Sequence, residues 1–246
     1  MTKAEIQFVR SLADKRVRDA EHLFVAEGDK LISEILSSGL RVRNIYALED
    51  HFEGRAERVT AKEMERISQL KTASTSLAVV EQPRHKTPTK APADRLALAL
   101  DGVQNPGNLG TIIRLADWFG VEDIFCSEDT ADCFNPKVVQ ATMGAILRVR
   151  VHYLKLADFL RRTAESGVAV YGTMLDGDDI YDAKLQTNGV IVMGNEGKGV
   201  SAECVKSFTH KLLIPAYPPE RQGSESLNVA MATGIVCAEF RRRTRG

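Results

Sequence analysis

The chain has 246 residues, of which 43% are hydrophobic and 27% charged, a balance that is typical of a folded soluble protein and excludes disorder as its main state. Its 33 basic and 33 acidic residues cancel, so a polyanion would have to be bound by a local patch rather than by net charge. No apolar run approaches the ~20 residues of a membrane span, and the charged N-terminus is unlike a signal peptide. The four scattered cysteines predict neither a disulfide frame nor a metal site. We therefore expect a cytoplasmic protein that does not engage a membrane.

The first part of the chain alternates helical and strand patterns. Helical spacing of apolar and charged residues predicts helices over 4–20 and 61–70, and a further helix is expected to open at Gly28 and stop at Gly39. Short apolar runs predict strands at 23–26, 42–48 and 76–80. Residues 1–82 are therefore predicted to form a small α/β domain.

A basic, proline-rich segment follows this domain. Residues 83–93 contain three prolines and almost nothing apolar, and each proline blocks a helix and removes a backbone donor. We interpret 83–93 as a linker, which makes 94–246 the second domain.

The second domain is predicted to contain a parallel sheet. Near-continuous apolar strands alternate with helical segments, as is typical of a sheet covered on both faces. The expected strands are 96–100, 121–126, 148–154, 168–174, 189–193 and 211–214, and the expected helices are 112–119, 137–147, 156–166 and 227–243. Ligands of such sheets bind beyond the carboxyl ends of the strands. We therefore look for function in the loops after Leu100, Met174, Met193 and Ile214.

The loop after Leu100 ends in a candidate functional arginine. Residues 105–108 predict a turn in which Asn108 caps the next helix. Arg114 lies in the first turns of that helix, where a cation could meet a phosphate or a reacting hydroxyl. A surface salt bridge is the alternative interpretation of Arg114.

The loop after Met193 carries three glycines within residues 194–199, which would allow the backbone to approach a ligand closely. The segment does not match a phosphate-binding Walker A motif, because Val200 follows Gly199 where the motif requires lysine. The loose dinucleotide fingerprint at Gly197 lies far from the first strand–helix turn in which it belongs, so an NAD-dependent oxidoreductase is not favoured. Glu196 is left open between a helix-dipole partner and a ligand contact.

The loop after Ile214 leads to the last helix, for which Ser226 is the predicted N-cap. Together the three loops resemble the three signature motifs of the SpoU/TrmH class of the SPOUT superfamily, which are S-adenosylmethionine-dependent RNA ribose methyltransferases. The matching residues are Asn108-Leu109-Gly110 with Arg114, residues 194–199, Ile214-Pro215 and residues 226–230, and residues 135–145 also resemble a helix of the family. The resemblance runs from about residue 95 to the C-terminus. Residues 24–28 and the helix after them resemble, less specifically, the family's small ribosomal-protein-like substrate-binding domain.

The resemblance implies a fold and an activity. The fold would be an α/β SPOUT domain with a C-terminal trefoil knot, preceded by the small domain and paired as a homodimer through the C-terminal domain. The activity would be methyl transfer from S-adenosylmethionine to a ribose 2′-hydroxyl in RNA, with ribosomal RNA favoured over transfer RNA. A non-catalytic, ribosome-associated RNA-binding protein is the alternative.

The resemblance also implies residue roles. Arg114 would act as base or as anchor of phosphate and hydroxyl, and the supporting polar set would be Asn108, Glu196, Ser226 and Asn228. Thr173, Gly194, Ile214 and Leu227 would hold the cofactor, and no metal is implied. The chain departs from the family at Ala216, where methionine is usual, and in a longer loop between Ile214 and Leu227.

Local basic clusters are the candidate contacts for a polyanion, because phosphate neutralisation depends on local charge. These clusters are Lys15-Arg16-Val17-Arg18, Arg84-His85-Lys86 with Lys90, and Arg241-Arg242-Arg243 with Arg245. The N-terminal domain and linker are therefore expected to bind RNA, and the C-terminal domain to bind the cofactor.

Overall fold

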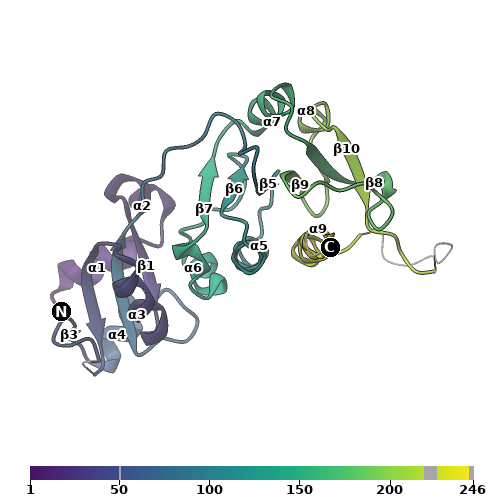
Figure 1. The fold of residues 1–246 in the computed structure, drawn as a ribbon. Helices are drawn as coiled ribbons and strands as arrows, with labels where there is room; N and C mark the ends of the chain where they lie inside the picture. The colour runs from purple at the N-terminus through teal and green to yellow at the C-terminus, as the bar shows by residue number, and fades with distance from the viewer. Residues whose placement is uncertain (50, 219–225, 244–246) are drawn as a thin grey trace. The chain divides into compact units, whose positions relative to one another are not determined.

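The computed structural model describes residues 1–49, 51–218 and 226–243, and its contacts divide the chain into two units (Figure 1). The first unit joins residues 1–84 to residues 132–147, and the second contains residues 85–131 and the chain from 148 onward. The domain limits expected from the sequence, with the first domain ending at 82 and the second starting at 94, stay a prediction. The contacts add that 132–147 packs with the first unit although it lies far along the chain.

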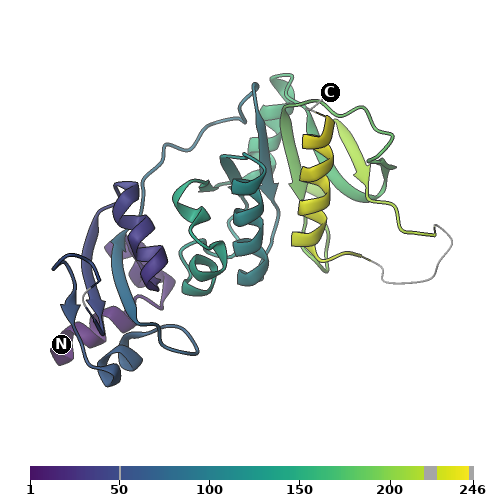
Figure 2. The same ribbon diagram turned by 60° about the horizontal axis from the view of Figure 1, so that its bottom comes forward.

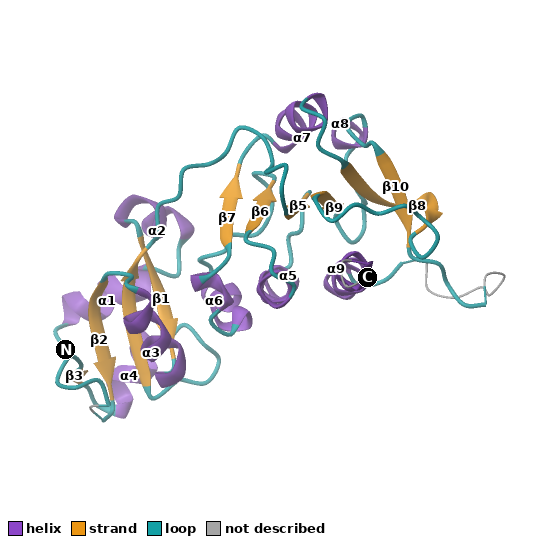
Figure 3. Ribbon diagram, in the orientation of Figure 1, coloured by secondary structure: helices purple, strands orange, loops and turns teal. Residues whose placement is uncertain are grey.

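The first unit is a four-stranded sheet with helices on both faces (Figure 3). The strands lie in the order β1-β4-β2-β3, and β4 runs antiparallel to both of its neighbours. Side chains alternate between the faces of a strand, so Leu23 and Val25 pack with α1 and α4 while Phe24 and Ala26 pack with α3. The elements are α1 (Lys3–Ser11), α2 (Lys15–Glu21), β1 (Leu23–Glu27), α3 (Asp29–Ser38), β2 (Val42–Ala47), β3 (Glu57–Arg58), α4 (Ala61–Ile67), β4 (Ser76–Glu81), α6 (Pro136–Thr142) and the 3-10 turn η1 (Ala145–Leu147).

The first helix expected from the sequence is divided into two helices, α1 and α2. The prediction of a single helix over 4–20 is wrong, because α1 ends at Ser11 and α2 starts at Lys15. The Asp14 side chain accepts the backbone N–H of Arg16 and so begins a new helix. The helix from Asp29 to Ser38 ends at Gly39 as expected, with Gly39 in the left-handed conformation that glycine adopts most readily.

The segment 132–147 completes the core of the first unit. The Phe134 ring lies 5.0 Å from the Phe24 ring, centroid to centroid, and Val139 is buried in the same cluster. At the start of the segment, Asp132 accepts two hydrogen bonds from the guanidinium of Arg18, whose side chain is 1% exposed. Arg18 therefore holds this segment and is not available to RNA, which corrects the expectation for the first basic cluster.

The second unit is a six-stranded, all-parallel sheet in the order β10-β8-β9-β5-β6-β7, which confirms the predicted fold class. Figure 1 shows α7 and α8 on one face and α5 and α9 on the other. The elements are β5 (Leu96–Leu100), α5 (Pro106–Trp118), β6 (Asp123–Cys126), β7 (Arg150–Tyr153), α7 (Leu156–Glu165), β8 (Val170–Asp179), β9 (Gly189–Met193), α8 (Ala202–Val205), β10 (His210–Leu213) and α9 (Val229–Arg242).

The strand order places a topological switch point between β5 and β9. From β5 the chain moves outward to β6 and β7 on one side, and the later strands lie on the other side. Although β10 is an edge strand, the helix after it returns to pack against α5, and both views show the two helices side by side (Figure 2). The implied trefoil knot would need such a return and stays a prediction.

Two further features of the described residues concern the cysteines and the helix lengths. All four cysteines are buried. No helix in the described part of the chain has the length and apolar character that crossing a bilayer requires.

Candidate active site

Three loops meet at the carboxyl edge of the sheet. They follow β5, β9 and β10, and the first two leave neighbouring strands at the switch point, where parallel α/β sheets bind ligands. Asp101 links the first two loops, because its carboxylate accepts the backbone N–H of Ser201 at 2.7 Å. Function was expected in these loops, and their side chains form one connected set.

The helix after β5 starts earlier than expected. Its N-cap is Asn105, whose side chain accepts the N–H groups of Gly107 and Asn108, and Pro106 occupies the first helical position. The prediction that Asn108 caps this helix is therefore wrong. As a consequence, the Asn108 side chain is left to reach the neighbouring loops.

The last helix starts later than expected. Asn228, rather than Ser226, is its N-cap, and its side-chain oxygen accepts the N–H groups of Ala230 and Met231 at 3.0 and 3.3 Å. Ser226 lies outside the helix and is exposed. With its oxygen engaged by the helix, the Asn228 amide nitrogen is left to donate elsewhere.

A directed chain of hydrogen bonds joins the three loops. Asn228 Nδ2 donates to Asn108 Oδ1 at 3.0 Å, and Asn108 Nδ2 donates to Glu196 Oε1 at 2.5 Å. The helix cap fixes the polarity of this chain, because an asparagine has only one acceptor and one donor group. The donors then all point toward the carboxylate, and a charge-assisted hydrogen bond ends the chain. The structure thus unites Asn108, Glu196 and Asn228, which the sequence placed up to 120 residues apart.

Asn195 is a site residue that the sequence reasoning missed. Its side-chain oxygen accepts the N–H groups of Gly197 and Lys198, and its Nδ2 donates to the carbonyl oxygen of Gly102 at 2.7 Å. It therefore closes the turn that carries Glu196 and ties that turn to the first loop. An asparagine in a glycine-rich segment is a known signal for such a side-chain turn.

The glycine loop has its own architecture. Asn195 and Gly199 form an antiparallel bridge, and a Cβ at Gly194 would lie 2.4 Å from the carbonyl carbon of Gly199. The loop is therefore a tight hairpin turn, and α8 begins only at Ala202 and is four residues long. A dinucleotide fingerprint requires a helix that opens directly from the glycines. This loop therefore does not have the geometry of a dinucleotide-binding motif.

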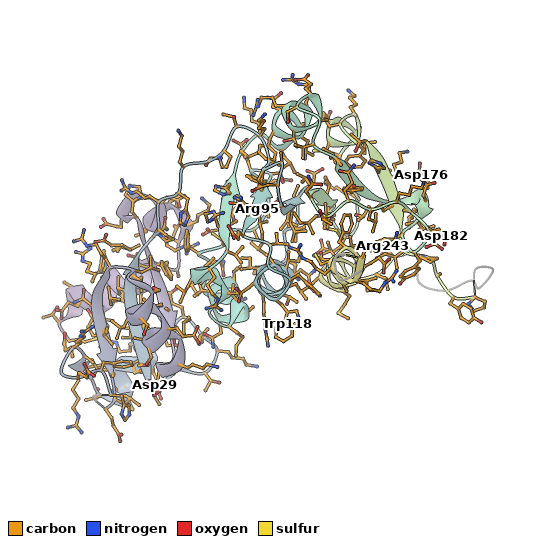
Figure 4. All side chains as sticks on the ribbon, viewed as in Figure 1. Asp29, Arg95, Trp118, Asp176, Asp182 and Arg243 are labelled. Atoms are coloured by element: carbon orange, nitrogen blue, oxygen red, sulfur yellow. The ribbon has the colours of Figure 1, made fainter. Side chains whose placement is uncertain are left out.

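Arg114 stands apart from the hydrogen-bonded chain. It lies in α5 with its side chain exposed, and within the described residues its guanidinium has no hydrogen bond or ion pair. The alternative of a surface salt bridge therefore finds no partner in that part of the chain. One helical turn further on, Trp118 is 84% exposed and its ring points away from the ribbon (Figure 4).

The four expected cofactor residues lie within β8, directly after β9 and β10, and at the end of the third loop. Thr173 begins a five-residue excursion of β8, because Lys211 pairs with Gly172 and the next residue, Leu212, pairs with Asp178. The Thr173 hydroxyl donates to the Val192 carbonyl at 2.9 Å and holds the excursion against β9. Gly194 and Ile214 directly follow β9 and β10, and Leu227 lies next to Asn228. Their contacts with a cofactor stay a prediction.

An all-parallel α/β sheet with its polar side chains gathered at a switch point, and with a last helix folded back beside α5, is the architecture of the SPOUT-class methyltransferases. Residues 95–238 match the SpoU rRNA methylase family, and residues 3–85 match the MRM3-like substrate-binding domain. The chain therefore belongs to the SpoU rRNA methylase family, as the motifs indicated.

Relatives of known name or structure agree with this assignment. The chain is 30% identical over 94% of both chains to the 23S rRNA (guanosine(2553)-2′-O)-methyltransferase RlmP of Bacillus subtilis (strain 168). Its fold superposes with a TM-score of 0.89 and 39% identity on a Porphyromonas gingivalis protein assigned to the TrmH family of RNA methyltransferases, covering 99% of each chain. It superposes with a TM-score of 0.86 and 30% identity on the AdoMet-bound rRNA methyltransferase of Sinorhizobium meliloti, covering 99% of this chain and 96% of that one.

Proposed function

We propose that the protein transfers a methyl group from S-adenosylmethionine to a ribose 2′-hydroxyl in ribosomal RNA. The observation that carries this proposal is the chain from Asn228 through Asn108 to Glu196, which draws one residue from each family motif into a single hydrogen-bonded set. The names of the B. subtilis and S. meliloti relatives support rRNA as the substrate class. Because the proposed substrate is ribosomal RNA, we also propose that the protein is cytoplasmic.

The chemistry requires a positioned hydroxyl. S-adenosylmethionine supplies an electrophilic methyl group on its sulfonium, and the neutral hydroxyl must lie in line with it. The exposed guanidinium of Arg114 has no hydrogen bond or ion pair within the described residues, and we propose that it holds the phosphate and hydroxyl of the target nucleotide. A guanidinium is almost always protonated in proteins, which favours this anchoring role over that of a base.

The described residues fit a nucleoside cofactor. Leu175 in the β8 excursion is 75% exposed and Leu227 is 50% exposed, so the edge of the sheet offers apolar surface of the kind that an adenine ring covers. Ile214 adds a backbone N–H and a carbonyl group outside any strand, and Pro215 adds a carbonyl group. We propose that Thr173, Gly194, Ile214 and Leu227 hold the cofactor there.

The proposal is tested with purified protein, radiolabelled S-adenosylmethionine, and RNA from a strain that lacks the gene. Ribosomal RNA should accept label that survives alkaline hydrolysis as a dinucleotide, because a 2′-O-methyl group protects the adjoining phosphodiester. Label released as mononucleotide would indicate base methylation, and label confined to transfer RNA would overturn the substrate class. Binding of RNA without any transfer would favour the non-catalytic alternative.

Most of the basic clusters are engaged within the protein. Lys15 pairs with Asp19 and Arg16 with Asp14, and Arg242 and Arg243 both pair with the buried carboxylate of Glu239. Arg241 donates to the backbone carbonyls at the end of α5, and Arg245 lies outside the described residues. The linker cations are the remaining cluster: Arg84, Lys86 and Lys90 are exposed and have no ion pair within the described residues.

The linker cluster is therefore proposed to contact RNA phosphates together with the N-terminal domain. Replacing Arg84, Lys86 and Lys90 by glutamine should make the slope of log K against log salt less negative by about 2, because each neutralised phosphate contributes about −0.7 to the slope for a single strand. Filter binding across a salt series measures the slope. Lys184→Gln with Lys206→Gln, on exposed lysines elsewhere, is the control, and an unchanged slope in the linker variant would refute the assignment.

A homodimer through the C-terminal domain is also proposed. Val229, Ala230 and Val236 of α9 are buried within the chain, whereas Met231 on the same helix is 63% exposed. Met231 and Trp118 come from helices that pack together, and large exposed apolar side chains mark an interaction surface.

Sedimentation velocity should show twice the 27.1 kDa chain mass at micromolar concentration. Trp118→Asp should shift the protein to monomer, because it places a charge in the contact. Met143→Asp, at an exposed methionine of the first unit, should leave the dimer intact. A monomeric native protein would contradict the proposal.

A further inference from the structure

The first loop of the site is held at its beginning as well as at its end. Gly102 is the second residue after β5, and its φ of +70° lies in the left-handed region that glycine favours. Its buried N–H donates to Ser127 Oγ at 2.8 Å, and its carbonyl oxygen accepts from Asn195 Nδ2 at 2.7 Å. Both backbone polar groups of this turn are thus fixed by side chains that follow two other strands.

Ser127 is the residue after β6 and belongs to none of the three motifs. Its hydroxyl donates to Asp129 Oδ1 at 2.6 Å, and this directs an oxygen lone pair toward the Gly102 N–H. The Ser127 N–H donates to the Leu100 carbonyl at 2.9 Å, on the strand that leads into the loop. Ser127 therefore hydrogen-bonds both the last residue of β5, Leu100, and the loop residue Gly102.

Residues that follow Ser127 form further hydrogen bonds with the end of β5 and the first loop. Thr130 Oγ1 donates to the Leu100 carbonyl at 3.2 Å, and the Ala131 N–H donates to the Val103 carbonyl at 3.0 Å. Residues 127–131 therefore wrap the chain from Leu100 to Val103. The loop continues from there into α5, which carries Asn108 and Arg114.

We propose that Ser127 is a positioning residue for the methyl-transfer site. It fixes Gly102 so that α5 starts where Asn108 reaches Glu196 and where Arg114 meets the nucleotide. The proposal rests on the proposed function for its kinetic consequence. Its structural consequence, a restrained first loop, does not depend on that function.

The test compares two variants that each delete one buried hydroxyl. Ser127→Ala removes the acceptor of the Gly102 N–H, and Thr163→Val removes the acceptor of the Ala91 N–H in the same unit, at 3.1 Å and away from the loops of the site. Both should lower the melting temperature. Ser127→Ala alone should lower kcat about 10-fold, with KM for RNA and Kd for S-adenosylmethionine within about twofold of native, because a misplaced reacting geometry lowers the rate more than the binding.

Hydrogen exchange supplies a readout that is independent of activity. The amides of residues 102–105, 107 and 108 should exchange about 10-fold faster in Ser127→Ala, because local opening of the loop becomes easier, and their exchange should be unchanged in Thr163→Val. Should Ser127→Ala fail to fold, Asp129→Ala at an exposed position removes the acceptor that orients the hydroxyl, and it should show the same exchange pattern. Native exchange in the loop, or equal losses of kcat in the two hydroxyl variants, would overturn the proposal. An inactive native enzyme with the expected exchange would refute only the proposed function.

Discussion

Arg114→Ala is expected to lower the rate of methyl transfer by about 100-fold or more, the scale of a lost positioning or acid–base group. The reason is that the exposed guanidinium makes no hydrogen bond or ion pair among the described residues, so its removal disturbs little else. The thermal midpoint and the affinity for S-adenosylmethionine should therefore stay close to native. Single-turnover transfer to ribosomal RNA, alongside calorimetric binding, measures both.

A lysine variant tests the anchoring role of Arg114, and a variant of another exposed arginine is its control. Lysine keeps the charge but loses the planar fork of donors, so Arg114→Lys should recover part of the activity if the residue anchors a phosphate. Arg161→Ala, at an exposed arginine of α7 in the second unit, is the control and should transfer methyl groups normally. Near-native turnover by Arg114→Ala would remove Arg114 from the mechanism.

Asp132→Ala should lower the free energy of unfolding by about 3 kcal/mol, because it leaves the Arg18 guanidinium buried without its counter-charge. Arg18 is 1% exposed, and its other hydrogen bonds go to the backbone carbonyls of Leu12 and Ala13, which carry no full charge. For a chain of this size the loss corresponds to a fall of roughly 10 °C in melting temperature. Urea denaturation followed by circular dichroism measures the change.

The control for this prediction is an exposed ion pair. Asp158 pairs with Arg161 at 3.6 Å with both side chains more than half exposed, so Asp158→Ala should cost less than about 1 kcal/mol. Asp132→Asn keeps the shape and one acceptor and should fall between the two. A loss below that of Asp158→Ala would show that the buried pair does not hold segment 132–147 in the first unit.

Strand patterns in the sequence located the sheet of the second unit closely. β5 and β9 begin and end where the apolar runs do, at 96–100 and 189–193. These strands are buried on both faces, so their hydrophobic runs are continuous and their limits are sharp. β8 was predicted to end at 174 and extends to Asp179, because its last residues resume pairing with β10 after the excursion and are polar.

Helix starts were less predictable, and the errors concern the site. Asn105 and Asn108 could each cap α5, Ser226 and Asn228 could each cap α9, and local preference does not choose within either pair. Tertiary contacts choose, because the cap at Asn105 leaves Asn108 for Glu196 and the cap at Asn228 leaves its nitrogen for Asn108.

The sequence by itself determined the class of fold, the family and the loops that carry function, since these depend on apolar periodicity and on short motifs. Only the tertiary structure decided that Asp132–Leu147 packs with the first unit, that Arg18 is a buried structural cation, and that Asn195 and Ser127 hold the loops of the site. Each of these depends on partners far apart in the chain, such as Arg18 and Asp132, which are 114 residues apart. A hydrogen bond or ion pair of that kind leaves no periodic trace in the sequence, because its partners are brought together by the packing of whole elements.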